Sequence, residues 1–412
     1  MRIAVLMLLA ATADAASVTI RGDGVFVFDG KPAFPIGFTT APVPGSHAPS
    51  GGDAYAELAK NGVVFNRCGI AGKWNPQSEA ALDAILDQAA KSGMRCAIYI
   101  PELTVIGPDD AAKEKELRRV VEKYRKHAAT AFWKGADEPE WGKIPVEKLR
   151  RFYEIVHELD PSHPVWITQA PRGSAETLKP YNAVYDVGAI DIYPVSYPPG
   201  VHTNRPNKNL SMTGDFAQLI GEVTSADRKP FWMVLQICFS GVAKPGATLR
   251  FPTFSEQRYM SYQSIIAGAR GLLYFGGNVP ACWNDQDKAL GWNWSFYGKV
   301  LKPVLDEFSP AGPLYPALIA PDSTIPVQVE GEGVEFRLRE AGHQLFILAA
   351  KREGSTVKAT FRGLPADATG GDLLYEAPRK VTVSSGAFTD WFGPNEVHAY
   401  RFIQPGSNGV KR

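Results

Sequence analysis

Apolar, strand-like runs recur along the first three quarters of the chain, and several are continuous rather than alternating. A strand that is buried on both faces has no polar side, so continuous runs predict a parallel sheet covered by helices. Eight runs fit this description, at residues 25–38, 63–69, 95–102, 130–139, 163–171, 187–195, 230–239 and 271–277.

Amphipathic segments with helical spacing lie between these runs. In residues 78–92, Ala81, Ile85 and Ala89 share one face, and Gly93 follows as a stop signal. Further helices are expected at residues 110–127, 145–159, 211–226, 254–269 and 294–308.

Strands that alternate with helices in this way predict a (β/α)8 TIM barrel. A doubly wound sheet is the alternative. It usually has fewer strands, and no glycine-rich phosphate-binding loop follows the first run.

The pattern changes after Pro310, where short segments of period two are separated by Gly, Asp and Ser. Such segments predict an antiparallel β-sandwich. A proline-rich stretch at 309–322 marks the junction. We therefore expect a barrel at residues 16–315 and a C-terminal β-sandwich at residues 316–412.

Residues 1–15 have the features of a secretory signal peptide. Arg2 supplies the positive start, residues 3–11 a short apolar run, and Ala13 and Ala15 a small-residue cleavage pattern. The run is too short to span a bilayer, and no other stretch approaches that length. We expect a secreted or periplasmic protein without membrane insertion.

Export permits disulfides among the four cysteines. Cys238 follows the seventh run and Cys282 the eighth, so adjacent strands would bring these two together. Cys68 and Cys96 are expected at opposite ends of neighbouring strands and therefore apart. Four buried thiols are the alternative.

Charge excludes some partner classes. The 44 basic and 43 acidic residues nearly balance, which gives no electrostatic reason to expect nucleic acid or an anionic membrane surface. No His, Asp or Glu cluster has metal-ligand spacing, and no cofactor is expected. The oligomeric state is open.

The active site of such a barrel is built at the carboxyl ends of its strands. There the chain places the carboxylates Glu102, Asp137, Glu138 and Asp191 beside amides, an arginine and several aromatic residues. This set can bind sugar hydroxyls, stack on sugar rings and supply an acid and a base.

These residues resemble a known family, the retaining (β/α)8 glycoside hydrolases called clan A. Residues 28–38, FDGKPAFPIGF, resemble its entry segment, and Asn66-Arg67 its second-strand arginine. Asp137-Glu138-Pro139 resembles its Asn-Glu-Pro motif, in which the glutamate is the acid/base. The resemblance implies a glycosidase in which Glu138 has that role.

Two departures alter what the resemblance implies. Asp137 replaces the family asparagine, and Gln236 stands where the family has the glutamate nucleophile of strand seven. An amide cannot act as a carboxylate nucleophile, so the double displacement does not carry over.

Asp191, which ends a buried run, becomes the expected second catalytic carboxylate. Strands four and six are not neighbours, so we expect Asp191 and Glu138 to be well separated, and a gap of roughly 6.5–9.5 Å would give inversion. Asp137 and Glu102 are expected in support, with Glu102 as a rival catalytic group. Glu256 instead forms a capping box with Thr253.

The sequence thus predicts an exported enzyme that hydrolyses a poly- or oligosaccharide. A barrel that binds glycans without cleaving them, and a retaining enzyme with a displaced nucleophile, are the alternatives. Expected to hold the sugar are Arg67, Tyr193, Gln236, Trp283, Asn284, Trp292 and Trp294.

Overall fold

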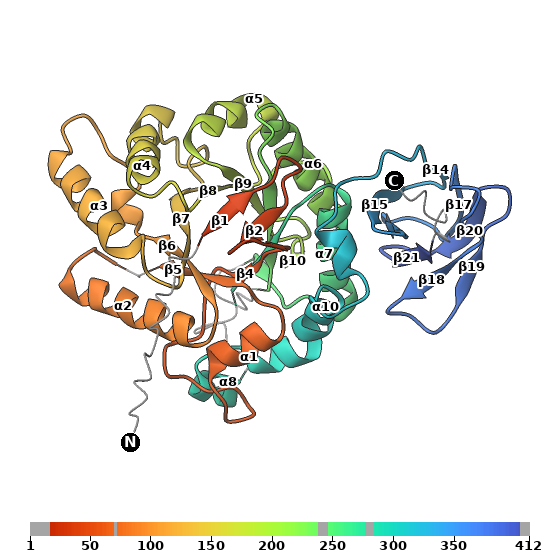
Figure 1. Ribbon diagram of the computed structural model, residues 1–412, viewed down its shortest axis with the longest axis horizontal. Coiled ribbons are helices and arrows are strands. Elements are labelled where there is room, and N and C mark those ends of the chain that lie inside the picture. Colours follow the sequence, from red (N-terminus) through yellow and green to blue (C-terminus); the bar gives the residue numbers. More distant parts are fainter. Residues whose placement is uncertain (1–16, 70–71, 238–245, 277–283, 404–412) are drawn as a thin grey trace, which may run out of the picture.

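The computed structural model describes residues 17–69, 72–237, 246–276 and 284–403 (Figure 1). Its central feature is a closed barrel of eight parallel strands, which confirms the predicted fold. In order around the barrel the strands are β4 (Ile36–Phe38), β5 (Phe65–Gly69), β6 (Arg95–Tyr99), β7 (Thr130–Asp137), β8 (Val165–Gln169), β9 (Val187–Ile192), β11 (Phe231–Gln236) and β13 (Leu272–Phe275).

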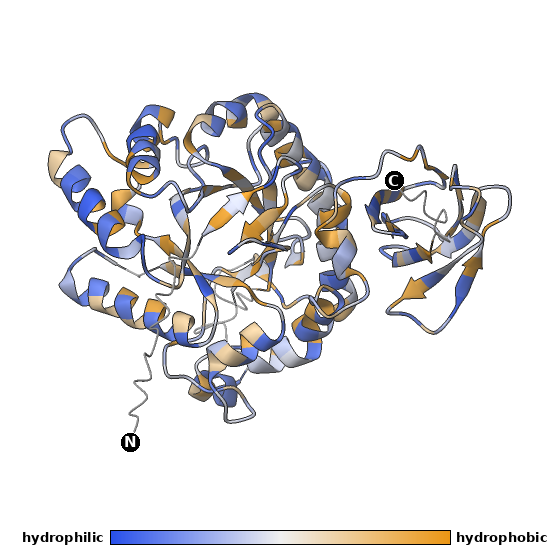
Figure 2. Ribbon diagram, viewed as in Figure 1, coloured by the Kyte–Doolittle hydropathy of each residue, from blue (hydrophilic) through white to orange (hydrophobic). Residues whose placement is uncertain are grey.

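Helices surround the barrel, and Figure 2 shows them with mixed hydrophilic and hydrophobic surfaces, as expected for a layer between core and solvent. The helices after the first strands are α1 (Ala54–Lys60), α2 (Pro76–Lys91), η1 (Pro101–Leu103), α3 (Ala111–Tyr124), α4 (Val146–Leu159), α5 (Ala175–Leu178) and η2 (Lys179–Val184). The later ones are α6 (Met212–Ser225), α7 (Phe254–Ile266), α8 (Asp285–Leu290), α9 (Trp294–Phe296), η3 (Tyr297–Leu301), α10 (Lys302–Glu307) and α11 (Tyr315–Leu318).

Local sequence signals explain several helix ends. The predicted capping box of Thr253 and Glu256 opens α7, and Asn75 and Ser78 form another at the start of α2. None of the helices in the described ranges is both long and apolar enough to span a bilayer.

Aromatic side chains close the amino-terminal end of the barrel. Phe65, Phe132 and Trp232 pack with ring centroids 5.0–5.3 Å apart inside the barrel, and Phe26 of the small β1–β3 sheet covers them. The strands of this small sheet are β1 (Val18–Ile20), β2 (Phe26–Phe28) and β3 (Lys31–Ala33). Figure 1 shows β1 and β2 lying across the barrel. These aromatic side chains therefore fill the amino-terminal end of the barrel, and the polar groups of the barrel lie at the carboxyl ends of the strands.

Two antiparallel sheets form the predicted C-terminal sandwich, seen at the right of Figure 1. One has the order β14 (Gln328–Glu330), β17 (Val357–Arg362) and β20 (Ala387–Phe392); the other has β15 (Val334–Ala341), β16 (Gln344–Lys351), β21 (Val397–Ile403), β18 (Gly370–Leu374) and β19 (Lys380–Thr382). The boundary at residues 315–316 stays a prediction; it falls in α11, ahead of the first sandwich strand.

Polar contacts join the sandwich to the barrel helices. Arg258 of α7 donates to the Glu307 carboxylate at 2.8 Å and to the Val397 carbonyl oxygen at 2.8 Å. Tyr375 donates to the Glu307 carbonyl oxygen at 2.8 Å. Buried apolar residues of both parts belong to one continuous cluster, so the sandwich is fixed to this side of the barrel.

A disulfide joins Cys68 to Cys96, with Cα atoms 5.6 Å apart. The expectation that these cysteines lie apart is wrong because the strands are staggered: Asn66, not Cys68, is opposite Cys96. Cys68 is thus a diagonal neighbour of Cys96 on the same face. The candidate pair Cys238 and Cys282 lies outside the described residues.

Removing this disulfide is expected to destabilise the barrel. It closes a loop with a sequence separation of 28 residues, for which chain entropy predicts a loss of about 3–4 kcal/mol. Thermal unfolding of the Cys68→Ala/Cys96→Ala double variant should show the lowered midpoint. An unchanged midpoint relative to the wild type would contradict the expectation.

Candidate active site

Two carboxyl groups meet at the mouth of the barrel. Asp191 of β9 is buried, and Glu138, which directly follows β7, is partly exposed. Burial raises the pKa of Asp191 well above its usual value, and the charge of Glu138 and a hydrogen bond with it raise the pKa further. The expected wide separation is therefore wrong, because both side chains reach into the barrel mouth. A like charge beside a buried carboxyl disfavours its ionised form, so Asp191 keeps its proton to a higher pH than an ordinary carboxyl.

The backbone at Glu138 has an unusual conformation. Its φ is +44°, a left-handed value that is costly for a residue with a side chain and that clusters at functional sites. The register of β7 shifts between Lys134 and Asp137, so the strand has a bulge at Gly135. A Cβ on Gly135 would lie 2.8 Å from Ile167, so no larger residue fits.

Asp137 lies between two cations. Its carboxylate is 3.1 Å from the Lys134 ammonium and 3.6 Å from the Arg67 guanidinium. These charges hold the pKa of Asp137 below its usual value, against the effect of burial. Asp137 thereby anchors the end of β7 that carries Glu138, and its supporting role in catalysis stays a prediction.

Lys134 is fully buried inside the barrel. Its ammonium donates to the Ala136 carbonyl oxygen at 2.8 Å and lies 5.2 Å and 4.8 Å from the ring centroids of Tyr99 and Trp166. Burial lowers the pKa of Lys134 to about 8, although Asp137 opposes the shift. The site thus contains a buried cation whose charge is lost at moderately alkaline pH.

Tyr193 connects Asp191 to a neutral histidine. The Tyr193 ring stacks on His202, with centroids 4.2 Å apart, and on Phe275, with centroids 5.1 Å apart. Its hydroxyl forms a hydrogen bond with Asp191, and its backbone N–H donates to His202 Nδ1 at 3.2 Å. Because neighbours cover both faces of the ring, Tyr193 orients Asp191 and offers no stacking surface to a sugar.

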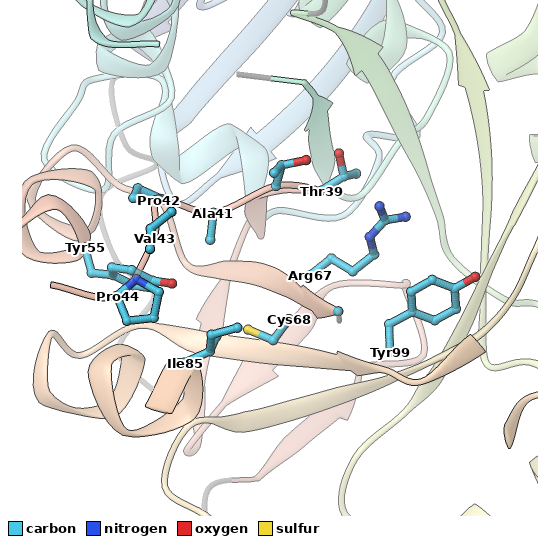
Figure 3. A pocket seen from close by; sticks show the side chains of 12 residues that line it. Thr39, Ala41, Pro42, Val43, Pro44, Tyr55, Arg67, Cys68, Ile85 and Tyr99 are labelled. Atoms are coloured by element: carbon cyan, nitrogen blue, oxygen red, sulfur yellow. The ribbon is translucent and has the colours of Figure 1, made fainter. Parts of the chain in front are cut away.

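A cavity of about 460 Å³ opens next to Arg67, the ion-pair partner of Asp137 (Figure 3). Arg67, Tyr99 and Thr39 line one side, and Pro42 and Tyr55 the other. Hydroxyls and one guanidinium beside apolar rings suit a small polar ligand. Within the described part of the chain, no group of three or more His, Cys, Asp or Glu could hold a metal ion.

Several solved structures with the same architecture are glycoside hydrolases. One, described only as a glycoside hydrolase, aligns over 94% of this chain and 97% of its own with a TM-score of 0.59 and 10% identity. A family 5 glycoside hydrolase from Bacteroides vulgatus aligns over 96% and 94%, with a TM-score of 0.59 and 12% identity.

A family 30 endoxylanase from Clostridium papyrosolvens aligns over 90% of this chain and 96% of its own, with a TM-score of 0.51 and 12% identity. No protein-family model and no curated protein matches the sequence. The fold is that of glycoside hydrolase barrels. At such low identity the likeness extends to the fold, and it confirms the predicted resemblance at that level.

Gln236 has a different place in this glycosidase-like barrel from the one predicted. It is fully buried, and its amide donates to the carbonyl oxygens of Val195 and Arg250 at 2.8 Å and 2.9 Å. Its own oxygen accepts from the Val195 N–H at 2.9 Å. The predicted sugar contact of Gln236 is therefore wrong, because this side chain holds two loops together.

The predicted sugar stacking on Trp292 and Trp294 is also wrong. Their exposed fractions are 1% and 4%, and their ring centroids lie 5.1 Å apart. Trp292 also packs edge-on against Phe38 and donates to the Thr40 carbonyl oxygen at 3.2 Å. Both rings are core, and Trp283 lies outside the described residues.

Two further predicted residues are engaged elsewhere. The carboxylate of Glu102 accepts from the Trp74 N–H at 2.6 Å, and no hydrogen bond or ion pair in the described ranges joins it to Asp137 or Glu138. Asn284 caps α8 by accepting from the Asp287 N–H at 2.8 Å. A sugar contact of Asn284 stays a prediction.

The sequence interpretation missed Lys134, His202 and Trp141 as parts of the site. Side chains alternate in direction along the strand, so Phe132 and Lys134 both point into the barrel. A charged side chain is not expected in a barrel interior, and Lys134 was therefore passed over. Trp141 directly follows the acidic motif and is 55% exposed. His202 lies in a loop, where no periodic signal exists to identify it.

Proposed function

We propose that this protein is an exported glycoside hydrolase that cleaves a glycosidic bond of a poly- or oligosaccharide. The proximity of Glu138 and Asp191 carries the proposal, because two neighbouring carboxyls, one with a raised pKa, supply an acid and a base at one place. Glu138, the more exposed member, protonates the leaving oxygen. Asp191, buried behind it, passes its proton to Glu138; as a carboxylate it then takes a proton from the water that adds to the sugar carbon as the glycosidic bond breaks, which restores the pair.

The second carboxylate acts only after the pair separates. In glycosidases the two carboxyl groups lie roughly 5 Å apart for retention and roughly 6.5–9.5 Å apart for inversion. Groups in hydrogen-bonding contact leave no room for a sugar or a water between them. Substrate binding must therefore displace one of them, and Glu138, which is partly exposed, is the one free to move.

Export is supported by the Cys68–Cys96 disulfide and by the signal features of residues 1–15. Disulfides persist in oxidising compartments and are rare in the cytosol. We propose a secreted or periplasmic location on this basis.

A glycan-binding barrel without hydrolysis is the second candidate. It is favoured by Gln236, which occupies the nucleophile position of strand seven with an amide committed to the backbone. This candidate shares the fold and the sugar ligand but predicts no turnover.

Incubation with a panel of poly- and oligosaccharides separates the two candidates. The hydrolase is expected to release new reducing ends from at least one member of the panel. Affinity electrophoresis on the same panel reports binding. A glycan that is bound but never cleaved, over a full pH range, would favour the binding protein.

A further inference from the structure

Arg172 and Trp141 form a pair at the rim of the active site. Trp141 lies in the turn after β7, closed by the Gly142 N–H, which donates to the Glu138 carbonyl oxygen at 2.9 Å. Arg172 follows β8, the neighbouring strand. The guanidinium carbon of Arg172 lies 4.4 Å from the centroid of the Trp141 ring.

The positive charge of Arg172 has no acidic partner. Among the described residues, none forms an ion pair or hydrogen bond with its guanidinium, whereas Arg67 of the same site is paired with Asp137. Glu140 is next to Trp141 in sequence, but it forms no ion pair with Arg172; its charge adds to the effect of burial, which raises the pKa of Tyr181. Arg172 is partly exposed, so its N–H donors are open to a ligand.

Trp141 adds an apolar surface next to this charge. The ring is 55% exposed, an unusual exposure for so large an apolar side chain in a folded domain. Stacking of the guanidinium against the ring orients both groups. A sugar ring can pack against the exposed part of the indole while the guanidinium binds a substituent of that sugar.

His202 and Tyr193 link this pair electrostatically to Asp191. Arg172 is close enough to His202 for its charge to act on the imidazole, His202 stacks on Tyr193, and Tyr193 binds Asp191. Burial, together with Arg172, lowers the pKa of His202 to about 4. His202 is therefore neutral at neutral pH and adds no charge beside Arg172.

We propose that Arg172 and Trp141 bind an anionic sugar residue, one with a carboxylate or a sulfate, next to Glu138. A planar guanidinium binds either oxyanion through two parallel hydrogen bonds, and a neutral sugar would leave its charge unmatched. The proposal rests on the proposed function, because it takes the ligand to be a glycan. It goes further in naming the substrate class as anionic.

Binding to matched glycans tests the proposal without requiring turnover. The Glu138→Gln protein is titrated with oligogalacturonate and its fully methyl-esterified form, and with sulfated and desulfated carrageenan oligosaccharides. We expect one charged form to bind more tightly than its neutral counterpart. A preference within the galacturonate pair indicates a carboxylate ligand, and a preference within the carrageenan pair indicates a sulfate ligand. Arg172→Met should weaken that binding about 10- to 100-fold, the effect of a charge-assisted hydrogen bond.

Two variants complete the experiment. Arg172→Lys keeps the charge but loses the planar pair of donors, so it should restore only part of the affinity. Arg150→Met removes an exposed arginine of α4 and should leave binding unchanged. Equal affinity for the charged and neutral forms would overturn the anionic subsite alone. Absence of binding to every glycan would overturn the proposed function with it.

Discussion

Replacing Glu138 by glutamine is expected to lower glycan hydrolysis about 100- to 10,000-fold, the usual contribution of general acid–base catalysis. Glutamine has the same shape as glutamate, so the left-handed turn at this position is retained. It cannot supply a proton to the leaving oxygen or share one with Asp191. The rate of reducing-end release at saturating substrate, compared with the wild type, measures the effect.

The matched control for this experiment is Glu140→Gln, which removes an acidic charge two residues away on the same turn. Its backbone N–H donates to the Gln169 side chain, a contact that the substitution leaves intact. Hydrolysis by this variant should stay close to the wild-type rate. If the two variants lost activity equally, the general charge of the turn would matter and Glu138 would have no special role as acid.

Lys134→Met is expected to change how stability depends on pH. In the folded protein the pKa of Lys134 is lowered to about 8 by burial, whereas in the unfolded chain it is near 10.5. Between these values the unfolded state binds a proton that the folded state does not, so this group makes the folded state more stable as pH rises. From below pH 8 to above pH 10.5, Lys134 raises the free energy of unfolding by on the order of 3 kcal/mol.

Denaturant unfolding at pH 7, 8.5 and 10 measures this effect. The free energy of unfolding of the wild type should rise relative to that of Lys134→Met as pH increases through the window. Lys126→Met, at an exposed lysine, is the control and should follow the wild type. Parallel curves for the wild type and Lys134→Met would mean that Lys134 is not held as a buried cation.

The sequence predicted the barrel well because strands buried on both faces carry an unmistakable apolar signal. The run at residues 63–69 corresponds to β5, and the run at 187–195 to β9. The run at 25–38 was interpreted as one strand, but it contains three. Asp29 and Gly30 turn the chain there with φ of 48° and 78°, an Asp-Gly signal that was present in the sequence.

The sequence predicted which residues stand at the strand ends of the site, but not how their side chains interact. The position of Glu138 and Asp191 follows from the rule that polar groups gather at the carboxyl ends of barrel strands. Their contact depends on how far each side chain reaches into the mouth, which no sequence spacing gives. Trp292 is buried against Phe38, a residue distant in sequence, and the sequence around Trp292 does not reveal this contact. The high tryptophan content of the segment therefore suggested a surface for sugar stacking.

The buried amide of Gln236 also limits how this barrel could change its chemistry. A glutamate at that position would place a carboxylate against the carbonyl oxygens of Val195 and Arg250, where two donated hydrogen bonds now hold the loops. The single substitution that would supply the family nucleophile therefore also removes the support of the loops around it. Double displacement in this barrel would require those loops to find new partners first, so the order in which mutations accumulate decides whether that route is open.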